Sequence, residues 1–269
     1  MIAIIGEVKG MNGLRTPIFE KGNVVTAEML NSLNELAAGY ARTGFYGYSN
    51  GILCGCKVLV NDGEILIGRG ILVVNECLYY ITEPMRKKIQ STNEWTIVQF
   101  VIDNCITYQN IERQELEVVI TSENDIRKDG IEICRFRLQQ GASLRVAGRH
   151  FQELETEFDT INEIYAQWSS YGESTISINI LQLFADEMGR KENREVIDYL
   201  FCQQIYQGNG RSINRKAIEM YINQKLRIKS DTYTNKEIYK RLVEILRLHT
   251  GNVSRMQERP RRMGPIIVD

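Results

Sequence analysis

The sequence predicts a multidomain α+β protein with four parts: an N-terminal helix, an antiparallel β sandwich or barrel, a heptad-like linking helix and a C-terminal helical bundle. Changes in the spacing of apolar residues predict this order. Apolar residues recur every three or four positions up to residue 40, form short β-branched or alternating runs over residues 52–144, and return to helical spacing after residue 150. Because no helix-like segment separates the strand-like runs, antiparallel pairing is favoured over a parallel α/β sheet.

We expect the domain boundaries to follow these changes in spacing. A chain of 269 residues is long enough for one large domain or two modest ones. The predicted parts are an N-terminal arm, helix and β-rich scaffold at residues 1–148, a linking helix and linker at 149–173, a helical bundle at 174–251, and an extended C-terminal arm at 252–269.

Composition and charge exclude several classes of function. The formal net charge is -1, so no global field attracts nucleic acid or anionic lipid. No apolar run approaches the length that spans a bilayer, and the apolar residues 1–5 predict a first strand rather than a secretion signal. The six cysteines lack the spacing of a zinc site or a redox pair, which predicts buried free thiols in a reducing cytoplasm.

The first helix is predicted to begin after a glycine-containing arm at residues 1–25. Thr26 can accept a hydrogen bond as the N-cap, and Glu28 lies in the positive first turn. One apolar stripe follows at helical spacing. Its members are Met29, Leu30, Leu33, Leu36, Ala37 and Tyr40.

The middle of the chain predicts a series of short antiparallel strands. Residues 61–63 and 75–76 are turn sites between apolar runs. Residues 131–138 alternate polar and apolar side chains, which predicts a strand with one face in water. A turn at 139–142 is expected to lead into a further strand at 143–146.

Apolar residues after His150 follow an a/d heptad pattern for nearly three heptads. The pattern predicts a helix about 30 Å long that associates with copies of itself. A single helix packed on its own domain would have the same pattern. The candidate oligomer interface consists of Phe151, Leu154, Phe158, Ile161, Tyr165 and Trp168.

A linker at residues 169–174 precedes four predicted helices, whose apolar residues lie within 180–188, 196–205, 213–226 and 238–246. Ser212 is the expected cap of the third helix. Thr234 and Glu237 form a capping box for the fourth, and Gly251 is a natural stop. Four short helices joined by short polar loops predict a compact bundle.

The C-terminal tail combines arginines with an apolar end, which predicts a partner-docking arm. Its arginines would form ion pairs on a neighbouring surface, while its apolar end would add a strand or fill a groove there. The candidate docking residues are Arg259, Arg261, Arg262, Ile266, Ile267 and Val268.

No pattern in the sequence predicts chemistry. His150 and His249 lack a second histidine at ligand spacing, and no serine or cysteine lies in a nucleophile-elbow pattern. Residues 208–210 do not form a phosphate-binding loop, because no strand precedes them and no Gly-Lys-Ser/Thr follows. We therefore predict that the protein is not an enzyme and has no catalytic residue, cofactor, metal site or small-molecule substrate. We also predict no nucleic-acid partner and no membrane insertion.

Three motifs of the N-terminal third resemble those of phage tail and contractile-injection baseplate proteins. The pattern is a helix start Gly-x-Val-x-x-Ala-x-x-Leu-Asn, a Gly-Ile-x-x-Gly strand, and a hairpin strand that begins with Asp-Gly and ends in glycine. The matching residues are Gly22, Val24, Ala27, Leu30 and Asn31, then Gly51, Ile52 and Gly55, then Asp62, Gly63, Leu66, Ile67 and Gly70.

The same region is similar to the trimeric baseplate component of type VI secretion. The resemblance implies a β-sandwich shoulder followed by a helical stalk. It also implies a structural subunit that binds copies of itself and other baseplate or tail proteins, assembling in the bacterial cytoplasm and ending in the baseplate of a virion or injection particle. Alternative hypotheses are a receptor- or glycan-binding module of a tail, a glycan-acting enzyme, and a nucleic-acid-binding regulator.

Overall fold

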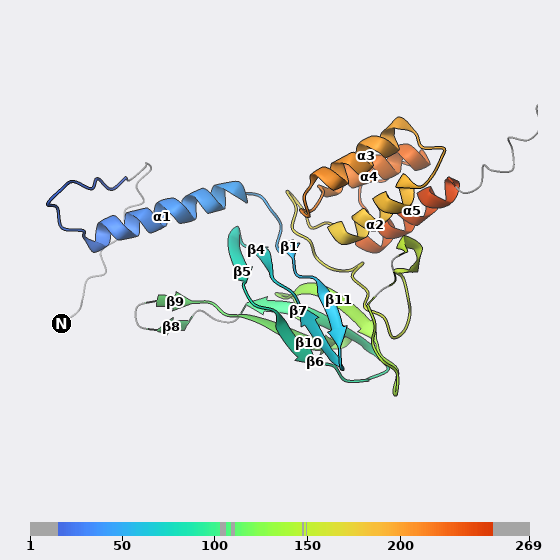
Figure 1. The fold of residues 1–269 in the computed structure, drawn as a ribbon, viewed down its shortest axis with the longest axis horizontal. Helices are drawn as coiled ribbons and strands as arrows, with labels where there is room; N and C mark the ends of the chain where they lie inside the picture. Colours follow the sequence, from blue (N-terminus) through green and yellow to red (C-terminus); the bar gives the residue numbers. More distant parts are fainter. Residues whose placement is uncertain (1–15, 103–105, 109–110, 147, 149, 250–269) are drawn as a thin grey trace, which may run out of the picture. The chain divides into compact units, whose positions relative to one another are not determined.

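The computed structural model describes residues 16–102, 106–108, 111–146, 148 and 150–249. The chain divides into two compact units, Met1–Tyr46 and Gly47–Asp269. Within these described residues, five α-helices and several antiparallel sheets confirm the α+β class (Figure 1).

The described part of the first unit is built around one helix, α1 (Ala27–Gly44). The Thr26 hydroxyl accepts a hydrogen bond from the Met29 amide at 3.3 Å, which confirms the predicted cap. The helix extends to Gly44, one turn beyond the last predicted stripe residue, Tyr40.

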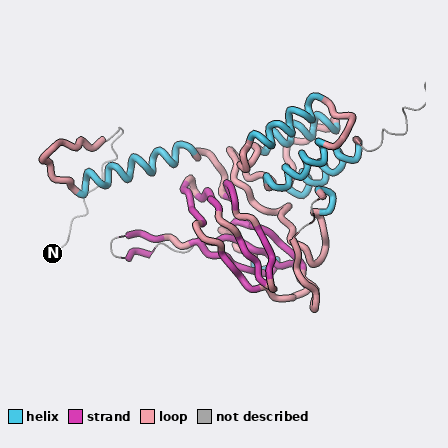
Figure 2. Tube along the Cα trace, in the orientation of Figure 1, coloured by secondary structure: helices cyan, strands magenta, loops and turns pink. Residues whose placement is uncertain are grey.

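The described strands of the second unit form three antiparallel sheets of three strands each, with a separate hairpin (Figure 2). Sharp hairpin turns connect several of them. Asp62 and Gly63 have φ angles of 48° and 76°, and Asn75 and Glu76 have φ angles of 49° and 63°. Such paired left-handed residues match the right-handed twist of the flanking strands, so both predicted turns are confirmed. The sheets are β1 (Gly51–Gly55), β4 (Gly70–Val74) and β5 (Cys77–Ile81) in the order β1-β4-β5; β2 (Val58–Asn61), β3 (Glu64–Ile67) and β6 (Met85–Lys88) in the order β2-β3-β6; β10 (Leu116–Ser122), β7 (Trp95–Ile102) and β11 (Ile131–Arg137) in the order β10-β7-β11; and the hairpin of β8 (Ile106–Tyr108) and β9 (Ile111–Arg113).

The prediction that β11 has one face in water is wrong. Its first four residues are all buried, including the charged Glu132. Glu132 is compensated by Arg135, whose Nε and Nη2 donate to the two carboxylate oxygens at 2.7 and 2.8 Å. An ion pair with two parallel hydrogen bonds lets a polar residue occupy a position that alternation assigns to solvent.

The predicted linking helix is not formed. After a short 3-10 turn at Phe151–Glu153, the segment at residues 154–173 runs in an irregular extended conformation. Asn162 exchanges two backbone hydrogen bonds with Arg135 of β11, at 2.8 and 2.9 Å. Asp159 has a φ of 56°, which interrupts any continuous helix.

The same segment also bonds to a second sheet. The Gln167 amide donates to the Glu132 carbonyl of β11 at 2.9 Å, and the Gln167 carbonyl accepts from the Ile52 amide of β1 at 2.9 Å. The Ser169 amide then donates to the Ile52 carbonyl at 2.8 Å. The segment therefore joins β11 to β1 through backbone hydrogen bonds to both strands, beside one local turn in which the Ala166 amide donates to the Glu163 carbonyl at 3.0 Å. The strand predicted at residues 143–146 is reduced to an isolated bridge between Arg145 and Thr160.

The four predicted C-terminal helices are confirmed. The capping box of the last one is present, because the Thr234 hydroxyl accepts from the Glu237 amide while the Glu237 carboxylate accepts from the Thr234 amide. The predicted cap Ser212 is wrong. Asn214 caps the third helix of the bundle instead, and the Ser212 hydroxyl donates to the Ser169 carbonyl. The helices are α2 (Ile178–Gly189), α3 (Val196–Gln207), α4 (Arg215–Leu226) and α5 (Asn235–Leu248).

The strands and the bundle share one hydrophobic core, as expected for a single compact unit. Phe151 packs between two helices, with its ring centroid 5.5 Å from Phe184 and 5.1 Å from Tyr239. The Tyr239 hydroxyl donates to the Phe151 carbonyl at 2.8 Å. The predicted domain boundaries at residues 148 and 173 are therefore positions within this unit.

Candidate assembly surface

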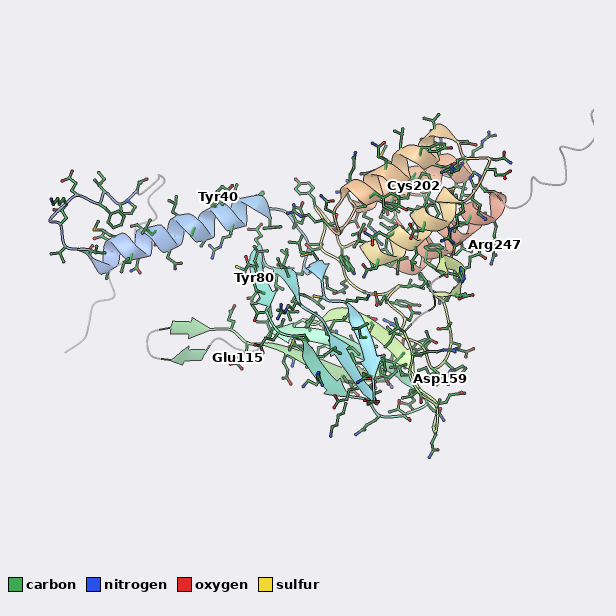
Figure 3. All side chains as sticks on the ribbon, viewed as in Figure 1. Tyr40, Tyr80, Glu115, Asp159, Cys202 and Arg247 are labelled. Carbon is green, nitrogen blue, oxygen red and sulfur yellow. The ribbon has the colours of Figure 1, made fainter. Side chains whose placement is uncertain are left out.

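The first unit presents an apolar stripe that its own described residues do not cover. None of the residues of α1 is buried. Leu30, Leu33 and Leu36 are 56%, 40% and 41% exposed, and Tyr40, which projects from the helix in Figure 3, is 85% exposed. With Met29 and Ala37, these side chains lie on one side of the helix at the three- and four-residue spacing that the sequence predicted.

The charged residues of α1 lie on the other side of the helix. Glu28, Glu35 and Arg42 are spaced by seven residues, so they align along one line of the surface. Glu28 lies in the first turn and Arg42 in the last, where each complements the helix dipole. The stripe is therefore free of charge, and α1 has its polar residues on one side and its apolar residues on the other.

The chain before α1 also carries exposed apolar side chains. Ile18, Phe19, Val24 and Val25 are 73%, 54%, 82% and 52% exposed. Scattered exposed apolar residues are ordinary, but so many large exposed apolar side chains within one short unit indicate a binding surface. We name the stripe of α1, consisting of Met29, Leu30, Leu33, Leu36, Ala37 and Tyr40, the α1 stripe.

An isolated helix of this length is marginal in water. Helices draw most of their stability from packing an apolar face, and a unit of 46 residues is close to the size below which chains rarely build a core alone. Covering the α1 stripe would supply that packing. Sequence reasoning located the stripe but did not identify it as a site; the glycines at 44, 47 and 51, which separate it from the β region, were the available signal.

The residues that heptad spacing predicted as an oligomer interface lie in the second unit and not on α1. Phe151, Leu154, Ile161 and Trp168 are 0%, 7%, 1% and 2% exposed and belong to the core of their own chain. The helical interface is therefore wrong, since contact with a second copy through these side chains would require the core to open. Self-association itself stays a prediction.

The two remaining heptad residues cover the arginines of β11. The Arg135 guanidinium lies over the Tyr165 ring, 3.8 Å from its centroid, and the Arg137 guanidinium lies 4.6 Å from the Phe158 centroid. Arg135 also forms the paired bond to Glu132, so its charge is neutralised from one side and stacked from the other. These aromatic residues hold the extended segment against β11.

The predicted docking arm lies outside the described residues. Its members are Arg259, Arg261, Arg262, Ile266, Ile267 and Val268. The assignment of this arm to a partner stays a prediction.

Two buried polar clusters are involved in holding the second unit together. Arg215 at the start of α4 donates to the Ser174 carbonyl at 2.6 Å, to Asn235 Oδ1 at 2.8 Å and to the Tyr233 carbonyl. The Arg215 side chain is 8% exposed, and its Nε lies 3.6 Å from Glu219 Oε1. The cluster joins α4 to the start of α5 and to the chain before α2.

The second cluster surrounds Asp198, which is fully buried in the first turn of α3. Its carboxylate accepts from the Tyr221 hydroxyl at 2.8 Å and from Lys225 Nζ at 3.0 Å. It also accepts from the Glu195 amide at 2.8 Å as part of a capping box, and His249 Nε2 lies 3.5 Å away. Every partner comes from the bundle itself, which indicates that Asp198 joins α3, α4 and the end of α5.

The described cysteines are free thiols, as the sequence predicted, but among them Cys54, Cys77 and Cys202 are only partly buried. Burial raises the pKa of the Cys56 thiol to about 12 and that of the Cys202 thiol to about 11. Because the thiolate is the nucleophile and the metal ligand, both groups are unreactive near neutral pH.

The described residues include no group of three His, Cys, Asp or Glu side chains arranged to hold a metal ion. Their hollows are open and partly polar; one of about 350 Å³ lies between Trp95 and Thr121 at the ends of β7 and β10. No helix within the described ranges has the length and apolar character needed to cross a membrane.

Comparison with known proteins does not assign the chain to a family. No family model matches the sequence, and no curated protein matches it. A crystal structure of TssK is similar at a TM-score of 0.37 and 10% identity, over 88% of this chain and 68% of that one. One chain of the type VI secretion TssK-TssF-TssG baseplate subcomplex has a TM-score of 0.38 and 9% identity, over 88% of this chain and 99% of that one. One chain of the type VI secretion baseplate complex has a TM-score of 0.33 and 9% identity, over 87% of this chain and 99% of that one. TM-scores below 0.5 do not establish a shared fold.

Proposed function

We propose that the protein is a structural subunit of the baseplate or tail of a phage-like or contractile injection particle. In this role it acts as an adaptor that binds copies of itself, as a trimer, and other baseplate proteins. It carries out no reaction and takes no cofactor. The glycine and aliphatic motifs of the N-terminal third support this class of protein.

The α1 stripe is the observation that carries the proposal. A helix with four large apolar side chains at 40–85% exposure, and all of its charges on the opposite side, is suited to packing against another helix or an apolar groove. An adaptor needs such an element outside its own core. The free chain then remains folded through its second unit while α1 is offered to neighbours.

The resemblance supports assembly with copies of the same chain, and the absence of charge from the stripe is compatible with it. Association through an apolar helix face brings identical surfaces together without placing like charges opposite one another. The C-terminal arm is the second element that we propose for partner docking. Its arginines and its apolar end would bind a different baseplate component.

The proposal is tested by measuring the mass of the native full-length chain by mass photometry and analytical ultracentrifugation. The wild type is expected to form a defined oligomer at micromolar concentration. Leu33→Glu should weaken self-association at least tenfold, because it places a charge at the centre of the α1 stripe. Asn31→Glu introduces the same charge on the polar side of α1 and should leave the oligomer unchanged.

Co-expression with the proteins encoded beside this chain tests the second half of the proposal. A stable complex with tail or baseplate proteins is expected. A wild-type chain that is monomeric at micromolar concentration and binds none of these neighbours would rule the proposal out.

A further inference from the structure

The outer face of α3 differs from those of the other three helices of the bundle. Asp198 is the only charged residue between Val196 and Gln207, and it is fully buried. The exposed positions of α2, α4 and α5 all include charged residues, such as Asp186, Lys216 and Lys240. The exposed side of α3 is therefore neutral along its whole length.

This neutral surface is rich in large apolar side chains. Val196, Leu200, Tyr199 and Tyr206 are 75%, 60%, 50% and 51% exposed. Tyrosine enrichment and depletion of charge characterise the centre of protein interfaces. We name this surface the α3 face; it consists of Val196, Tyr199, Leu200, Gln203, Tyr206 and Gln207.

Contacts at its border hold both tyrosine rings in place. The Arg194 guanidinium lies over the Tyr199 ring, 4.4 Å from its centroid. The Tyr206 hydroxyl donates to Asp186 Oδ1 at 2.5 Å. A surface whose aromatic side chains are already ordered loses less conformational entropy when a segment binds to it.

The end of the described chain lies close to α3. His249, the last described residue, has its Nε2 3.5 Å from Asp198 Oδ2 in the first turn of α3. Residues 250–269 follow, and Ile266 is seventeen residues beyond His249. A chain of that length spans up to about 56 Å when extended and about 23 Å as a flexible coil. Because α3 is only about 18 Å long, every part of the α3 face is within reach.

The composition of this segment matches the α3 face. Ile266, Ile267 and Val268 form its apolar cluster, and arginines precede them. Acidic groups stand near both ends of the α3 face: Asp186 beside Tyr206, and Glu195, which is 71% exposed, before Val196. Tethering on the same chain supplies an effective concentration on the order of millimolar, which favours an intramolecular contact over one between copies.

We propose that the α3 face is the binding site for the chain's own C-terminal segment, with Ile266, Ile267 and Val268 on Val196, Tyr199 and Leu200. The segment that docks onto a partner in the assembled particle is thereby held on its own bundle in the free chain. The contact is independent of the α1 stripe, so it can be measured in the Leu33→Glu background as well as in the wild type.

Site-specific photocrosslinking tests the contact in the full-length chain. A benzophenone amino acid is placed at position 200, and the products are digested and sequenced by mass spectrometry. We expect a link within one chain to residues 263–269, reduced at least fivefold by the double variant Ile266→Asp/Ile267→Asp. The same probe at position 240, on the charged outer side of α5, should give no such link.

A mixture of ¹⁴N- and ¹⁵N-labelled chains separates the possible occupants. Links between chains of different label, links to α1, or no link to residues 263–269 would each overturn the proposal. A second measurement uses a fluorescent peptide of residues 250–269 and the full chain whose own segment carries Ile266→Asp/Ile267→Asp. Leu200→Glu should weaken binding of this peptide at least tenfold, whereas Lys240→Glu should not; equal binding to both variants contradicts the proposed site.

Discussion

Glu163 illustrates at the residue scale how burial sets a pH dependence. It lies in the extended segment that pairs with β11. Burial raises the pKa of its carboxyl from 4.5 to about 7, although Asn179 and Lys57 act in the opposite direction. The folded chain therefore favours the protonated acid, while the unfolded chain ionises near 4.5. The resulting contribution to stability is complete below about pH 4.5 and is lost as the pH rises through about 7.

This dependence gives a prediction for Glu163→Gln, which mimics the protonated acid at every pH. The free energy of unfolding of the wild type should fall between pH 5.5 and pH 8 by about 2 kcal/mol more than that of the variant. Urea denaturation at the two pH values measures the difference. Equal pH dependence in the two proteins would show that Glu163 does not carry the effect.

Arg215 gives a second prediction at the residue scale. Arg215→Met removes the donors to the Ser174 and Tyr233 carbonyls and leaves Glu219 without its cation. We expect a loss of about 3–5 kcal/mol in the free energy of unfolding, measured by chemical denaturation. Arg215→Lys retains the charge but not the planar fork of donors, so it should recover only part of the loss. Full stability in Arg215→Met would contradict a joining role for this cluster.

At the element scale, sequence reasoning succeeded where local chemistry determines the structure. Thr26 and Thr234 were identified as caps because a hydroxyl just before a helix can accept a hydrogen bond from a free amide of the first turn. The turns at Asp62-Gly63 and Asn75-Glu76 were found because Asp, Gly and Asn tolerate positive φ, and one or both of the two residues in each turn are of these types. The apolar patterns of α2 to α5 were long enough to fix the type of element.

The linking segment could not be predicted in the same way. Apolar residues spaced by three and four positions also fit an extended chain with turns, provided that each one reaches a core. Phe151 and Trp168 do so, and the backbone between them bonds to Arg135, Glu132 and Ile52, which lie far away in the sequence. The spacing of apolar residues alone carries no information about these distant partners. The candidate site was missed for the related reason that an apolar stripe does not reveal whether its own chain covers it.

Asp159 tests the structure of this segment. Its φ of 56° is a left-handed conformation, and its Oδ1 accepts from the Gln139 amide at 2.9 Å (its position is labelled in Figure 3). Asp159→Val places a β-branched residue in that conformation and removes the acceptor, so a loss of about 2–3 kcal/mol is expected. Asp159→Asn retains a side-chain oxygen that can accept this hydrogen bond and the tolerance for positive φ, and should cost less than about 1 kcal/mol. Thermal and urea unfolding measure both variants; equal losses would contradict the proposed role of the φ angle.

At the scale of the second unit, the shared core predicts cooperative unfolding. Trp95 and Trp168 lie in the β region and the linking segment, whereas the far-ultraviolet signal at 222 nm reports mainly on helices. Transitions followed by tryptophan fluorescence and by circular dichroism should therefore coincide. Phe151→Ala should shift both together by about 3–5 kcal/mol, because its ring packs against Phe184 and Tyr239. Two separated transitions would show that strands and helices fold as independent domains.

The joining of β1 to β11 by one late segment also bears on how the protein is made. The Ser169 hydroxyl bonds to the Ser49 carbonyl across 120 residues. While a ribosome is still translating the stretch between them, the edge of β1 that later accepts this segment has nothing to pair with. Nascent chains that stall before residue 169 would expose that edge, so the finished fold should form slowly and prematurely ended products should be prone to aggregation.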